Sequence, residues 1–177
     1  MGLIDKVVAA VTPEPSDEER AAARAKARVA AGGNGWLAMV LDHHEQLEAA
    51  FAAVRDAGSP ATRRAAQKSL SLLLTAHSIA EEAVLYPAMA LADQKAHSGE
   101  AYVQQSAAKV QAAALEDLEP MSEAFLDKLE HLRAAVAHHM YQEESTWFPR
   151  LREAGETEKQ AQLSRRYQQE FERYMAS

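Results

Sequence analysis

Two segments of the chain repeat one pattern of residues that can bind metal. Residues 77–87 read HSIAEEAVLYP and residues 139–149 read HMYQEESTWFP, so both give His-x-x-x-Glu-Glu followed by an aromatic residue and proline. Residues four apart on an α-helix lie on one face, so each segment presents an imidazole beside a carboxylate. Buried carboxylates are costly unless they are compensated, and together with imidazoles they suit iron, manganese or zinc.

Apolar helix stripes carry these residues into the predicted interior. His77 and Glu81 continue one stripe with spacings of three and four, and His139 and Glu143 continue another. His44 lies on a third such stripe, on an earlier helix. At a rise of about 1.5 Å per residue, antiparallel helices place these residues at one level. A single histidine on an apolar face is usually an ordinary core residue, but this convergence indicates a cation site.

The neighbouring polar residues are expected to play smaller parts. Glu82 and Glu144 lie roughly 100° further round their helices, where they are either solvated or support the ligands. Glu48 lies beside its stripe and is expected in solvent. A register shift of one residue would exchange His138 with His139. The histidines expected at the surface are His43, His97, His131 and His138.

Glycine and proline delimit the helices that must position these residues. Ser16 and Glu19 form a capping box that opens a peripheral helix ending near residues 32–33. The four central helices are expected at about residues 35–57, 61–86, 100–118 and 122–148. Pro87 is expected to end or kink the second of them. Short connections make antiparallel neighbours, so the pattern predicts an all-α, up-down-up-down four-helix bundle.

The remaining chain flanks this bundle. A last amphipathic helix starts at Thr157, and the apolar start of the chain is interpreted as an arm. We therefore divide the sequence into an N-terminal arm with a peripheral helix, the bundle, and a C-terminal helix packed on it: residues 1–34, 35–154 and 155–177.

Composition narrows the classes of function. The 177 residues include 47% hydrophobic and 25% charged residues, which suits one globular domain. The net charge of −7 argues against a nucleic-acid partner. The absence of cysteine excludes disulfides, thiolate metal ligands and a thiol nucleophile. No apolar run approaches the roughly 20 residues of a membrane span, and the first residues make a poor signal peptide, so a cytoplasmic protein is expected.

The quoted segments, with DHHEQL around His44, resemble the hemerythrin-like family and its HHE cation-binding domain over about residues 35–153. The resemblance implies a non-haem di-iron site: two iron ions (Fe2+/Fe3+) joined by an oxo or hydroxo bridge and by carboxylates. It implies dioxygen, peroxide or nitric oxide as the small-molecule ligand. Carried over by position, the imidazoles would be terminal ligands and the two glutamates would bridge the irons. These residues are His44, His77, Glu81, His139 and Glu143.

The sequence departs from the family on its third bundle helix. The family has a histidine there, whereas the matching position is Gln105, in a segment without histidine. Tyr102 lies one turn earlier on the same face, and a ferric ion lowers the pKa of its ligands, so Tyr102 is a candidate phenolate ligand. In the alternative, Tyr102 is a core residue whose hydroxyl bonds to a carboxylate. The ligand from this helix, Tyr102 or Gln105, is left open.

Three functions are compatible with these residues. The first is a di-iron protein that binds or senses dioxygen or a related species. The second is a catalase-like di-iron enzyme that decomposes peroxide, because an anionic ligand in place of an imidazole stabilises ferric iron. The third is a helical partner-binding module in which the metal is only structural. Whether the chain is an enzyme is left open.

Overall fold

The computed structural model describes residues 15–176, and within that range the chain is helical with no strand. This confirms the predicted all-α class. The helices are α1 (Asp17–Ala31), α2 (Trp36–Asp56), α3 (Pro60–Ala80), α4 (Tyr86–Leu91), α5 (Lys95–Ala114), α6 (Glu123–Gln142), α7 (Phe148–Ala154) and α8 (Thr157–Met175). Two single turns of π-helix, η1 (Glu81–Leu85) and η2 (Glu143–Trp147), join α3 to α4 and α6 to α7.

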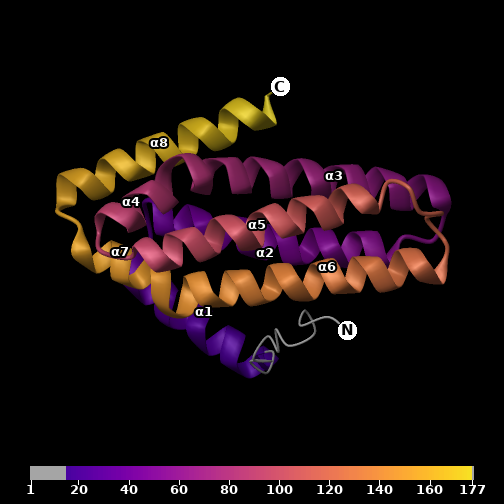
Figure 1. The fold of residues 1–177 in the computed structure, drawn as a ribbon, viewed down its shortest axis with the longest axis horizontal. Coiled ribbons are helices and arrows are strands. Elements are labelled where there is room, and N and C mark those ends of the chain that lie inside the picture. The colour runs from indigo at the N-terminus through magenta and orange to yellow at the C-terminus, as the bar shows by residue number, and fades with distance from the viewer. Residues whose placement is uncertain (1–14, 177) are drawn as a thin grey trace, which may run out of the picture.

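The long helices α2, α3, α5 and α6 lie side by side along the molecule (Figure 1). Helices α3 and α6 each contact both α2 and α5, so the four surround a common interior. Helix α1 lies against α2, η2 and α7, and α8 packs on α3, α2 and η1. No helix in the described part is long and apolar enough to span a bilayer. The apolar arm expected at the start of the chain lies outside the described residues.

The interior contains two apolar clusters with the histidines and glutamates between them. Along α2, Leu41 belongs to one cluster and Leu47 to the other, and His44 lies between them. Along α3, His77 similarly lies between Leu74 of the second cluster and Ala80 of the first. The polar layer is therefore enclosed by apolar packing on both sides, away from water.

The helix ends follow local chemistry, with one clear departure from expectation. The Ser16 backbone nitrogen donates to Glu19 Oε2 over 2.8 Å, and the Glu19 nitrogen donates to Ser16 Oγ over 3.2 Å, which confirms the capping box. Helix α5 begins at Lys95, five residues before the expected start at residue 100, and ends at Ala114, four residues before the expected end at residue 118. The expectation was wrong because the polar residues before Gly99 were interpreted as a loop.

Arg63 is a buried link at the end of the bundle remote from these residues. Its guanidinium donates hydrogen bonds of 2.8–3.1 Å to the carbonyl oxygens of Val54, Arg55, Ala57 and Pro120. We expect Arg63→Leu to lower the free energy of unfolding by about 3 kcal/mol in chemical denaturation, because it leaves these carbonyls without their donor. The exposed Lys68 on the same helix is the control, and Lys68→Leu should change it by less than about 0.5 kcal/mol.

Candidate metal centre

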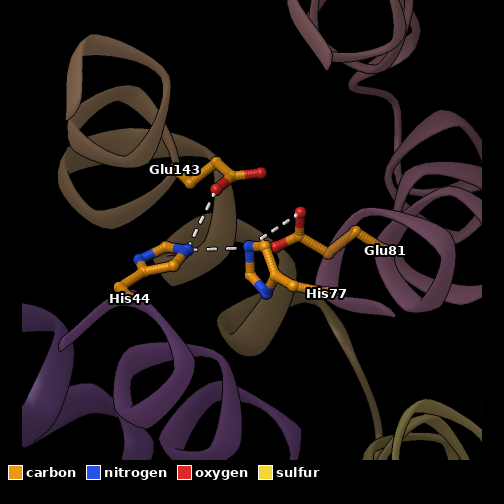
Figure 2. Close-up of side chains that lie close together, drawn as sticks. All are labelled: His44, His77, Glu81 and Glu143. Carbon is orange, nitrogen blue, oxygen red and sulfur yellow. Dashed lines mark ion pairs between the residues drawn. The ribbon is translucent and has the colours of Figure 1, made fainter. Parts of the chain in front are cut away.

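Four buried side chains from four helical elements converge in the polar layer. His44 comes from α2, His77 from α3, Glu81 from η1 and Glu143 from η2, and Figure 2 shows them pointing toward one another. One donor atom of each lies within 4.8 Å of the others. Each is at most 2% exposed. The structure therefore brings two imidazoles and two carboxylates into one small volume.

The distances show that Glu143 lies between two histidines. Glu143 Oε2 is 3.3 Å from His44 Nε2, and Glu143 Oε1 is 3.2 Å from His139 Nε2. Glu81 Oε2 is 3.2 Å from His77 Nε2, while Glu81 Oε1 is 4.0 Å from His44 Nε2. Each of the two carboxylates thus faces imidazole nitrogens, and Glu143 faces one on either side.

All three histidines are oriented in the same way. Each turns Nε2 toward the glutamates and holds Nδ1 in a hydrogen bond to an outer group, which fixes the orientation of the ring as outer partners do for metal ligands. The outer partners are Glu144 Oε1 for His44 (2.7 Å), the Tyr167 hydroxyl for His77 (3.1 Å) and Gln104 Oε1 for His139 (2.7 Å).

Several polar atoms in this layer are buried without a hydrogen-bond partner. Such atoms are rare in folded proteins, because each loses its hydrogen bonds to water without gaining one within the protein. Those in the layer are His44 Nε2, Glu81 Oε1, Glu143 Oε2 and Gln105 Oε1. Within residues 15–176, no lysine or arginine pairs with Glu81 or Glu143. The three oxygens carry lone pairs, and so does His44 Nε2 in the neutral ring, so a cation fits this donor set.

The electrostatics of the layer show the same need for positive charge. Burial raises the pKa of Glu81 well above its ordinary value, and the charge of Glu143 adds to this. Burial also opposes ionisation of Glu143, but His139 and His44 hold its pKa below the usual range. Burial opposes protonation of His44, but the neighbouring carboxylates of Glu143 and Glu144 outweigh it and raise the pKa of His44 to about 10. Protons here supply the positive charge that a metal ion would supply.

Tyr86 belongs to the layer, although the sequence did not single it out as a site residue. Its hydroxyl is 2.9 Å from Glu143 Oε1, and 3.1 Å from both Glu81 Oε2 and His139 Nε2. In an α-helix, residues five apart lie roughly 140° apart, which would turn Tyr86 away from Glu81. In η1 the Tyr86 amide donates to the Glu81 carbonyl, the i to i+5 bond of a π-turn, which brings the two onto one face.

The structure separates the two candidates on α5. Gln105 is buried, and its amide nitrogen donates to Glu81 Oε2 over 2.5 Å. The Tyr102 side chain is at the surface, and its hydroxyl donates to the Glu82 carbonyl oxygen over 2.7 Å. That carbonyl is free because Pro87, five residues on, has no amide to bond it in the π-turn. The Tyr102 hydroxyl is therefore bonded to the main chain of η1 and not to the carboxylate of Glu81 or Glu143.

The second glutamate of each repeat differs in its surroundings. Glu144 is buried and accepts hydrogen bonds from Arg24 of α1 as well as from His44. Glu82 is partly exposed, and its carboxylate is 2.6 Å from Lys109 Nζ. Both residues were expected either to be solvated or to support a ligand. Glu144 supports the candidate ligand His44, whereas the Glu82 carboxylate contacts Lys109 instead. Glu48 accepts from Arg24 at the rim of the same ion-pair group.

Among the outlying histidines, the surface expectation is confirmed only for His131. It was wrong for His43, which is half-buried under α8, stacks on Phe171 at 3.8 Å and bonds to the Tyr167 hydroxyl over 2.9 Å. It was also wrong for two others that neighbouring elements partly cover: His97, stacked on Trp147, and His138, beside α1. It is His139, and not His138, whose ring nitrogen contacts Glu143.

Comparison with protein families supports the class of the site. The family described as "Hemerythrin HHE cation binding domain" matches residues 37–151, well over half of the chain. The match contains all three inward-facing histidines and both facing glutamates. The chain therefore belongs to the hemerythrin HHE cation-binding family. No curated protein and no solved structure matches it.

The outer partners of the histidines provide a first test of metal binding. We expect Glu144→Gln to lower the affinity for the metal by about 10–100-fold, because His44 loses the charged group that orients it. Competition with a chelator measures this. Glu48→Gln is the matched control, since Glu48 also bonds to Arg24 but does not contact His44. An equal loss in both variants would assign the effect to Arg24 instead.

Proposed function

We propose that the chain is a non-haem di-iron protein, built on an up-down-up-down four-helix bundle, that binds dioxygen or reacts with peroxide or nitric oxide in the cytoplasm. The observation that carries this proposal is the common orientation of the three histidines, whose Nε2 atoms face two buried glutamates while Nδ1 is bonded outward. Membership of a cation-binding family supports it. When bound, iron supplies reversible dioxygen binding or electron exchange with peroxide.

The chain's own residues divide into two half-sites in this proposal. His44 and His77 would hold one iron and His139 the other, with Glu81 and Glu143 as the carboxylates available to both. The two oxygens of Glu143 already face different histidines, which supports a bridging role. Apolar packing on both sides of the layer keeps bulk water from the irons.

Metal analysis tests the proposal directly. Protein from iron-supplemented growth should contain close to two irons per chain. One zinc per chain, or no metal after loading with ferrous iron, would contradict it. For the loaded protein, a colour change in air that reverses under vacuum supports a dioxygen carrier.

A catalase-like reaction is a second candidate, favoured by one observation. Gln105 stands where the family's third-helix histidine is expected, so one neutral imidazole is missing, and an anionic ligand in its place would disfavour simple reversible binding. Oxygen evolution from added peroxide by the iron-loaded chain would support this enzyme activity. No evolution above that of free iron at equal concentration would exclude it.

A further inference from the structure

The Tyr86 hydroxyl lies in the half-site of His139, among groups that it cannot all satisfy. The ring is fully buried, and its oxygen is 2.9–3.1 Å from one oxygen of each facing glutamate and from His139 Nε2. A phenol has one proton to donate. With both glutamates as acceptors, that proton can serve only one of them at a time.

In its neutral form, His139 adds a further lone pair. The Gln104 amide nitrogen donates to Glu100 Oε1 and to Gln142 Oε1, so its oxygen is the atom that faces His139. His139 Nδ1 therefore carries the ring proton and donates to Gln104 Oε1 over 2.7 Å. His139 Nε2 is left with a lone pair directed at Tyr86 and Glu143. With His139 neutral, three electron-rich atoms thus surround a single phenol proton.

The spacing of these atoms matches the coordination shell of a metal ion. Ligands about 2.1 Å from a cation and at right angles to one another are separated by about 3.0 Å. The separations around Tyr86 are 2.9, 3.1 and 3.1 Å, and His139 Nε2 is 3.2 Å from Glu143 Oε1. The half-site of His139 therefore has the dimensions of a cation site with the phenol oxygen as one corner.

We propose that Tyr86, from the π-turn after Glu81, is an oxygen ligand of the second iron and replaces the imidazole that α5 lacks. The inference rests on the proposed di-iron function and specifies one of its ligands. On metal binding the phenol gives up its proton to water, and the phenolate oxygen bonds to the cation. Gln105 supports the arrangement by holding Glu81 Oε2, and Tyr102 stays on the Glu82 carbonyl.

The test uses the colour that a phenolate gives to ferric iron. The full chain is loaded with ferrous iron and oxidised in air, and its visible absorption, resonance Raman spectrum and iron content are recorded. We expect a phenolate-to-iron charge-transfer band, with tyrosine ring modes enhanced on excitation within it and shifted by ring-deuterated tyrosine. In Tyr86→Phe the band and the ring modes should vanish. Tyr102 provides the control, because its ring centroid is 5.1 Å from that of Tyr86. In Tyr102→Phe, the charge-transfer band and the enhanced ring modes should both persist.

The possible results separate this inference from the function on which it rests. Iron bound at two per chain without a phenolate band overturns Tyr86 as a ligand and leaves the di-iron proposal standing. A band retained in Tyr86→Phe, or lost only in Tyr102→Phe, also overturns it. Failure of the wild-type chain to bind iron overturns the proposed function. Phenylalanine should fold at this position, because the second repeat has Phe148 there, fully buried.

Discussion

Glu81→Gln is expected to remove most of the bound iron while leaving the helices intact. The glutamate contributes one oxygen 3.2 Å from His77 Nε2 and another that is buried without a hydrogen-bond partner. Because loss of an outer partner alone costs about 10–100-fold in metal affinity, loss of this carboxylate should cost more than about 100-fold. Iron per chain after dialysis against a chelator measures the effect.

The same substitution should do little to the fold without metal. Burial raises the pKa of Glu81 well above its ordinary value, so burial without a cation favours the neutral carboxyl form, whose shape glutamine shares. We expect the free energy of unfolding of the iron-free chain to change by less than about 1 kcal/mol. A large loss of stability in the iron-free variant would show that Glu81 is structural.

The adjacent glutamate provides the matched control. Glu82 lies on the same π-turn but is partly exposed and pairs with Lys109. Glu82→Gln removes the same charge one residue away and should leave iron binding unchanged. If both variants lost iron equally, the effect would reflect net charge and not ligation.

The level of the site could be predicted from the sequence because it depends only on helical periodicity. His77 and Glu81 are four residues apart within regular helix or its first π residue, so the 3.6-residue repeat places them correctly. Tyr86 lies beyond the extra residue of the π-turn, where that repeat fails. The sequence signal that would have revealed it is the proline after the tyrosine, whose missing amide favours such an irregular turn.

The contacts that the flanking helices make with the site could not be predicted, because they depend on how those helices pack. Arg24, which bonds to Glu144, and Tyr167, which bonds to His77 and His43, lie outside the segment that matches the family. The two repeats look alike in sequence, yet α1 covers Glu144 while Glu82 reaches toward Lys109 on α5. Equivalent glutamates therefore have different burial and different partners.

Iron loading should raise the thermal unfolding midpoint by roughly 8–16 °C. Glu81 and Glu143 are fully buried and face each other, and binding of a cation compensates both in the folded chain only. A ligand present at about 1,000 times its Kd adds about 4 kcal/mol to the free energy of unfolding. In a chain of this length, each kcal/mol of unfolding free energy raises the thermal unfolding midpoint by about 2–4 °C.

Melting curves followed by circular dichroism, before and after iron removal, give the size of this shift. The Glu81→Gln chain is the control, since it should melt at the same temperature with and without iron. Because its carboxylate is replaced by a neutral amide, any general effect of iron on the helices would still appear in it. Equal midpoints for the loaded and iron-free wild-type chain would contradict the claim that a cation compensates the two buried carboxylates, even if iron were found in the purified protein.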